Sequence, residues 1–201
     1  NSNGDSRMTL KLNGSSSGSV SIDAPASTTG GADLTYTLPN ATTGGIIRTT
    51  TTPGAILQVL QDVKTDAWSG DTTFADITGL SQAITPTASS SKILVRYMVW
   101  MGSSAQTHKE TLLQRDIGGA GYGNIQATAH GCTTYSYTGD SDEEHHSLPN
   151  YFEYLDSPNT TSAVTYKIQG RVGSGTAYVN RKHQVSTVLN TSYITLMEIA
   201  G

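Results

Sequence analysis

The stretch SKILVRYMVWMG, residues 91–102, is apolar on both of the faces that a β-strand would present. Side chains alternate between the two faces of a strand. One face would carry Ile93, Val95, Tyr97, Val99 and Met101, and the other Leu94, Met98 and Trp100. A sheet with one wet face cannot cover both rows. We therefore expect this strand to lie in a layered all-β domain, with one row in its core.

The C-terminal stretch SYITLMEIAG, residues 192–201, repeats the pattern, with Ile194 and Leu196 opposed by Tyr193, Met197 and Ile199. Two arrangements would cover a strand of this kind. Either both faces are buried within one chain, or one row fills the core and the other forms a subunit interface. For the second arrangement we predict a homotrimer with a fixed set of interface residues: Met98, Trp100, Ile194 and Leu196.

Short apolar segments at regular spacing continue this reading from residue 55 onward. The segments are AILQVLQDVK, TFADITGL, QAITP, TLLQRDIGG, AGYGNIQATAHG, NYFEYLD, AVTYKIQG and TAYVNR. Turn clusters between them are typical of an antiparallel β-sandwich or jelly roll. LLQRD is long enough only to begin a short helix. Residues 162–181 read as a strand, a glycine-rich turn and a second strand.

Residues 1–54 differ from the rest and form a short-strand N-terminal extension. MTLKLNG, GSVSIDAP and ADLTYTLPN are brief alternating segments, separated by glycine-rich stretches and by Pro25 and Pro39. None of them can bury a face alone. We expect residues 1–54 to serve for attachment to partner proteins and for trimer winding, and residues 55–201 to form the sandwich domain.

Composition excludes several classes of partner. The chain has 201 residues, 14% of them charged, with a net charge of −4, so we expect no nucleic-acid binding. It has no apolar run of membrane-spanning length, so we expect no membrane insertion. It starts at Asn1 without a leader, which predicts a soluble fragment or processed product. Cys132 is the only cysteine and reads as a small buried hydrophobe.

No pattern in the sequence predicts catalysis. The cluster GDSDEEHH, residues 139–146, lacks the spacing of a metal site and reads as a solvated loop. GDS, at residues 4–6 and 139–141, lacks the strand and helix context of a nucleophile. Glu153 and Asp156 are the one suggestive carboxylate pair, and satisfied carboxylates at a strand end explain them equally well. We expect no enzyme, no metal and no cofactor.

Tyrosines in loops rich in glycine, serine and threonine suggest a recognition surface. Tyrosine offers a rigid, amphipathic contact area suited to sugars or proteins. Residues 121–150 form the insertion-like segment, and loops on a rigid scaffold often carry recognition. The predicted receptor-contact residues are Tyr135, Tyr137, Asp140, Asp142, Glu143, His145 and His146.

The string of motifs also supports a resemblance. LKLNGSSSGSVSIDAPASTTGGADLTYTLPN resembles the short strand repeats of bacteriophage tail fibres and other virion proteins, especially of phages of marine and cyanobacterial hosts. The remainder, with FADITGLSQAITPTASSSKILV, LDSPNTTSAVTYKIQGR and SYITLMEIAG, is similar to the terminal domain that follows such repeats. The resemblance implies a trimer whose jelly-roll head is similar to the tumour-necrosis-factor and complement-C1q type.

The resemblance implies a structural protein of a virion. The first expectation is a tail-fibre tip that binds a host glycan or an outer-membrane protein. The alternative is a capsid decoration or head-fibre protein, located on the capsid surface. A polysaccharide depolymerase is third, because no carboxylate constellation supports it. The sequence does not identify the host or its receptor.

Overall fold

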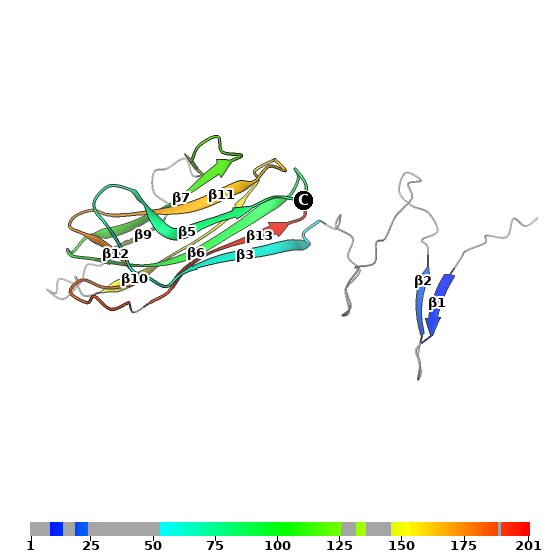
Figure 1. Cartoon of the computed structure of the whole chain (residues 1–201), viewed down its shortest axis with the longest axis horizontal. Helices are drawn as coiled ribbons and strands as arrows, with labels where there is room; N and C mark the ends of the chain where they lie inside the picture. The colour runs from blue at the N-terminus through cyan, green and yellow to red at the C-terminus, as the bar shows by residue number, and fades with distance from the viewer. Residues whose placement is uncertain (1–8, 14–18, 24–52, 126–131, 136–145, 189) are drawn as a thin grey trace, which may run out of the picture. The chain divides into compact units, whose positions relative to one another are not determined.

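The computed structural model describes residues 9–13, 19–23, 53–125, 132–135, 146–188 and 190–201 (Figure 1). The chain divides into two compact units, Asn1–Thr49 and Thr50–Gly201. In the first unit, β1 (Thr9–Asn13) pairs antiparallel with β2 (Ser19–Asp23), so that Leu10 lies opposite Ile22. A two-stranded sheet of this size is marginally stable in water.

The second unit contains strands only, within the part of the chain that the structure describes. They are β3 (Ile56–Lys64), β4 (Trp68–Gly70), β5 (Ala75–Ile84), β6 (Lys92–Ser103), β7 (His108–Ile117), β8 (Gly123–Asn124), β9 (Cys132–Tyr135), β10 (Ser147–Asp156), β11 (Val164–Val172), β12 (Ala177–Val179) and β13 (Ser192–Ile199). The predicted all-β class is therefore confirmed.

These strands form two antiparallel sheets that pack as a sandwich (Figure 1). The six-stranded sheet has the order β3-β13-β6-β12-β4, and β10 pairs with the other edge of β6. The five-stranded sheet has the order β5-β11-β7-β8, and β9 also pairs with β7. Partners are nested along the chain: β3 with β13, β5 with β11, β6 with β10 and β7 with β9. This is the pairing of a jelly roll.

The core lies between the sheets and is built from one row of each alternating strand. From β6 the row Ile93, Val95, Tyr97, Val99 and Met101 points inward, and each of these side chains is fully buried. Val164, Tyr166 and Ile168 of β11 meet them from the other sheet. Buried tyrosine hydroxyls usually have a hydrogen-bond partner. The Tyr97 hydroxyl lies 2.9 Å from Thr111 Oγ1, and burial raises the pKa of Tyr97.

One detail of the expected strand pattern is wrong and two are confirmed. Residues 73–80 and 82–86 do not form two strands, because β5 runs through with an irregularity at Gly79, whose φ of 84° suits glycine. The segment TLLQRDIGG is a strand as predicted, since LLQRD belongs to β7, with Thr111 and Leu113 facing the core. Residues 162–181 also form the two predicted strands, β11 and β12, which belong to different sheets.

The two ends of the sandwich differ. At the entry end, the chain joins β3, and Gly54 N donates to Ala200 O at 2.7 Å beside the last strand. The opposite end, here called the loop end, carries the connections from β6 to β7, β9 to β10, β11 to β12 and β12 to β13. Segments distant in sequence therefore meet at the loop end, whereas the chain enters the sandwich at the entry end.

Candidate functional site

The outer face of the six-stranded sheet carries apolar side chains in aligned rows. This outer face consists of Val59, Val63, Leu94, Met98, Trp100, Tyr151, Leu155, Tyr193 and Met197. Strand register places Val63, Tyr193, Met98 and Tyr151 side by side across four strands. It places Val59, Met197, Leu94 and Leu155 side by side in a second row.

Much of this apolar surface is open to solvent in one chain. Val59 is 52% exposed, Val63 51%, Tyr151 46% and Leu155 46%. The members on the central strands are half-buried by their neighbours in the same rows. Contiguous apolar surface of this kind is uncommon on monomers and marks interaction sites.

A polar row separates the two apolar rows. Arg96 Nε lies 2.8 Å from Glu153 Oε2, and Arg96 Nη2 donates to the Tyr151 hydroxyl at 3.1 Å. That hydroxyl donates to Glu153 Oε2 at 3.0 Å. On the neighbouring strands, Gln61 Nε2 donates to Thr195 Oγ1 at 2.8 Å. The polar groups of this row are paired within the chain, so covering the row would leave them satisfied.

The outer face of the five-stranded sheet is different in kind. Lys167 Nζ lies 2.8 Å from Asp76 Oδ2, and Gln169 Nε2 donates to Asp76 Oδ1 at 2.7 Å. Arg171 pairs with Glu110, and Lys167 Nζ lies 3.9 Å from the centre of the Tyr122 ring. This surface is charged and paired, as expected of a face that water covers. The sandwich is therefore asymmetric, with one apolar and one polar outer face.

The structure corrects half of the predicted interface set. Met98 and Trp100 lie on the outer face, half-buried, on the side opposite to the core row. Ile194 and Leu196 are fully buried in the core of one chain and cannot reach a partner. The physical reason is that β13 turns Tyr193 and Met197 outward. Sequence alternation showed the two rows of β13 without showing which one faces the other sheet.

Most of the predicted receptor-contact residues lie outside the residues that the structure describes. These are Tyr137, Asp140, Asp142, Glu143 and His145. His146 is exposed at the loop end, just before β10. Tyr135 is the last residue of β9, where its backbone pairs with His108 of β7. Residues 121–150 are thus not a single loop, because β8, β9 and the start of β10 lie within them.

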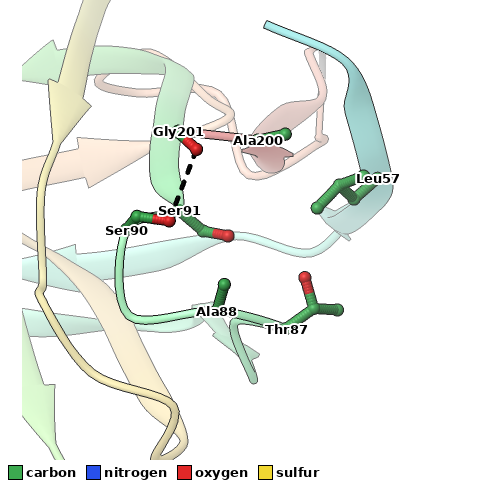
Figure 2. A pocket seen from close by; sticks show the side chains of 7 residues that line it. All are labelled: Leu57, Thr87, Ala88, Ser90, Ser91, Ala200 and Gly201. Carbon is green, nitrogen blue, oxygen red and sulfur yellow. Dashed lines mark hydrogen bonds between the residues drawn. The ribbon is translucent and has the colours of Figure 1, made fainter. Parts of the chain in front are cut away.

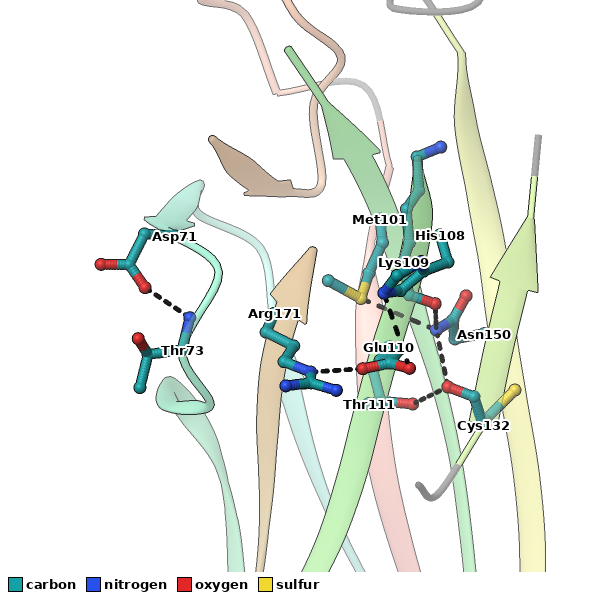
Figure 3. Close-up of polar contacts among 10 residues, drawn as sticks. All are labelled: Asp71, Thr73, Met101, His108, Lys109, Glu110, Thr111, Cys132, Asn150 and Arg171. Carbon is teal, nitrogen blue, oxygen red and sulfur yellow. Dashed lines mark hydrogen bonds and ion pairs between the residues drawn. The ribbon is translucent and has the colours of Figure 1, made fainter. Parts of the chain in front are cut away.

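A polar network fixes β9 and β10 to the core at the loop end (Figure 3). Asn150 Nδ2 donates to Lys109 O at 3.1 Å and to Cys132 O at 3.3 Å. Thr134 Oγ1 donates to Asn150 Oδ1 at 2.5 Å. Cys132 is half-buried, and burial raises the pKa of its thiol, which keeps it neutral. The network is satisfied and packed, which indicates a supporting role for these groups.

The suggestive carboxylate pair does not form a catalytic site. Glu153 points to the outer face and pairs with Arg96. Asp156 is buried on the opposite side of the strand, with Arg115 Nη1 at 2.7 Å and the Tyr166 hydroxyl donating at 2.7 Å. Because the strand separates the two acids, they cannot act across one cleft. Both are satisfied structural carboxylates.

A hollow of about 140 Å³ lies at the entry end (Figure 2). Its lining consists of Leu57, Thr87, Ala88, Ser90, Ser91, Ala200 and Gly201. No side chain in this lining is ionisable, so the hollow offers no acid or base. Across the described ranges, no group of three or more metal-ligating side chains gathers. Over the same ranges, no helix has the length and apolar character needed to cross a membrane.

Sequence reasoning missed a basic and aromatic cluster at the loop end. Arg181 Cζ lies 3.9 Å from the centre of the Tyr178 ring, and the His183 ring stacks on Tyr178 at 5.7 Å and 18°. The Tyr178 hydroxyl lies 3.2 Å from His183 Nδ1. The available signal was the run of basic residues at 181–183, in a chain of net negative charge.

No protein-family model and no curated protein sequence matches the chain. Among solved structures, the chain is similar to the Eiger TNF from S. frugiperda, with 12% identity and a TM-score of 0.35 over 67% of this chain and 92% of that one. It is also similar to the Gt strain structure of infectious bursal disease virus, with 12% identity and a TM-score of 0.40 over 91% of this chain. A third similarity, to the VP2 subviral particle of that virus, has 12% identity and a TM-score of 0.36 over 83% of this chain. The chain spans 48% and 43% of those two viral chains.

Proposed function

We propose that this chain is a structural subunit of a bacteriophage virion that assembles as a homotrimer through the apolar outer face of its six-stranded sheet. In this proposal it forms the tip of a tail fibre and contributes to attachment to the host surface, without catalysis. The observation that carries the proposal is the pair of aligned apolar rows on one outer face, with the charged outer face on the other side. The trimeric state and the virion context come from the sequence resemblance.

Burial of the outer face would supply the free energy of assembly. Each fully buried side chain of valine, leucine or methionine size contributes about 1.5–3 kcal/mol by leaving water. Val59, Val63 and Leu155 retain about half of their surface in one chain, so a partner can still bury them. The central Arg96 and Glu153 are paired with each other within the chain, so covering them would not leave a buried charge without a partner.

The two ends of the sandwich support the division of roles. The chain enters the sandwich at the entry end, where Gly54 N donates to Ala200 O, whereas β9 ends and β10 begins at the loop end. In this proposal the residues between β9 and β10, which include Tyr137 and His145, contact the receptor. Three copies would present three such segments, and avidity would strengthen weak individual contacts.

Light scattering of the wild type and of Met98→Asp tests the assembly. We expect a trimer for the wild type and a folded monomer for Met98→Asp, because an unpaired carboxylate in an apolar interface costs several kcal/mol. Ser81→Asp is the matched control, since Ser81 is exposed on the outer face of the other sheet, opposite Lys167. A wild type that remains monomeric at micromolar concentration would refute the proposed assembly.

Electron microscopy of the intact virion with a bound antibody fragment locates the subunit. Label at the fibre tips is expected. Label spread over the capsid surface would instead identify a decoration or head-fibre protein, which uses the same assembly face but has no part in attachment.

A further inference from the structure

Arg181 stands apart from the other arginines that the structure describes. Arg96, Arg115 and Arg171 each pair with a carboxylate. Arg181 has no carboxylate contact within the described part of the chain, and its one hydrogen bond runs from Nη1 to Val185 O at 3.4 Å. Among the described residues, the guanidinium therefore makes one hydrogen bond and a stacking contact but no ion pair.

The guanidinium is held in position by an aromatic stack. Arg181 Cζ lies 3.9 Å from the centre of the Tyr178 ring, which is only 9% exposed. The stacking of His183 on the same ring and its contact with the Tyr178 hydroxyl hold that ring in place. A guanidinium stacked on an aromatic ring keeps its planar donor edge directed outward, and less conformational entropy is lost when it binds an anion.

The backbone that carries this cluster is anchored on both sides. Asn180 has a φ of 62°, and its Nδ2 donates to Lys64 O at 2.8 Å and to Asp66 O at 3.0 Å. Ser192 Oγ donates to Asn180 Oδ1 at 2.6 Å. Arg181 O lies 2.7 Å from the point where a Cβ on Gly102 would stand, so only glycine allows this approach. The site is thus built on rigid elements.

A neighbouring lysine adds positive charge. Lys182 follows Arg181 directly and His183 comes next, and both are partly exposed. The carbonyl of the exposed His146 lies beside Arg181 O over Gly102. This basic cluster lies in a chain of net charge −4. A dense polyanion such as nucleic acid would be repelled by the rest of the surface more strongly than an anion carried on a sugar chain with spaced charges.

We propose that Arg181, with Lys182 and His183, binds an anionic group of an acidic polysaccharide on the host surface. The inference rests on the proposed attachment function and names its ligand class. A guanidinium offers two parallel N–H donors to a carboxylate, sulfate or phosphate oxygen pair, which a lysine ammonium cannot do. The bound sugar would approach the loop end, where Arg181 lies close to the start of β10.

Isothermal titration with short charged oligosaccharides tests the site. The probes are an oligogalacturonate, which carries carboxylates, and a kappa-carrageenan oligosaccharide, which carries a sulfate on every second sugar, with neutral dextran as the uncharged comparison. Wild type should bind at least one anionic probe and not neutral dextran, with affinity falling as salt rises. Arg181→Ala should weaken binding at least about tenfold, which corresponds to one charge-assisted contact. Arg181→Lys should recover only part of that loss.

Lys92→Ala is the matched control, because Lys92 is exposed at the start of β6, at the entry end. It should bind as the wild type does. Equal affinity of Arg181→Ala and wild type, an equal loss in Lys92→Ala, or no binding of either anionic probe would overturn the inference. Light scattering on the same samples separates this result from the proposed assembly. A trimer that binds no anion refutes the site alone, and a monomer that binds the probe refutes the assembly alone.

Discussion

Glu198 shows how a single side chain can hold the end of the sandwich together. It is fully buried, yet its charge is satisfied by neutral donors. Gln58 Nε2 donates to Oε2 at 2.6 Å, and Thr87 donates to Oε1 from its backbone N at 2.6 Å and from its hydroxyl at 2.7 Å. Burial raises the pKa of Glu198, but these hydrogen bonds to the charged form outweigh burial and lower it overall.

Glu198 should therefore make the domain sensitive to acid. Because the pKa is lower in the folded state, the carboxylate stabilises the fold at pH values above the ordinary glutamate pKa of about 4.3. That contribution is lost as the pH falls toward the folded pKa. Urea unfolding of the wild type and Glu198→Gln at pH 7, 5 and 3 measures it. The difference in free energy of unfolding between the wild type and Glu198→Gln should be smaller at pH 3 than at pH 7. A difference that is the same at all three pH values would contradict this role.

At the scale of the element, β13 separates the core from the outer face within two consecutive residues. Leu196 is fully buried between the sheets, while Met197 is half-buried on the outer face between Val59 and Leu94. The same substitution at the two positions should therefore have different effects.

Leu196→Ala should lower the free energy of unfolding by about 2–5 kcal/mol, since it leaves a cavity in the core. Met197→Ala should cost less than about 1 kcal/mol in a single chain. Both are measured by urea unfolding in the Met98→Asp background, which keeps subunit association out of the comparison. Similar losses at the two positions would contradict the assignment of the two faces.

The strands illustrate what sequence can and cannot predict. Alternation over residues 91–102 and 192–201 predicted both strands and the all-β class, since side-chain period is a local property. Which row of β13 faces inward depends on pairing with β6 and β3, which are distant in sequence, so Ile194 and Leu196 were misplaced. The alignment of Tyr151 with Met98 depends on register and was also beyond local pattern. Arg181 was missed because its stacking on Tyr178 depends on the tertiary structure and cannot be seen in a local sequence pattern.

At the scale of the whole molecule, the sandwich should fold without the N-terminal extension. Its nested strand pairs and its core lie within residues 55–201. Expression of residues 55–201 alone should give a single cooperative thermal transition, followed by circular dichroism. The full chain is the comparison, and its main transition should lie within a few degrees. A fragment without a cooperative transition would mean that residues 1–54 share the core.

The nested pairing of the strands also fixes when the proposed assembly surface comes into being. Val59 and Val63 lie on the first strand of the sandwich, and Tyr193 and Met197 on the last, which joins β3 to β6. During synthesis, β3 cannot pair with its strand partner β13 until almost the whole domain has left the ribosome. Pairing between strands so distant in sequence makes folding slow. The surface is complete only when the final strand is in place. In the proposed assembly, a chain without β13 therefore lacks the complete docking face, so association would follow the folding of the sandwich.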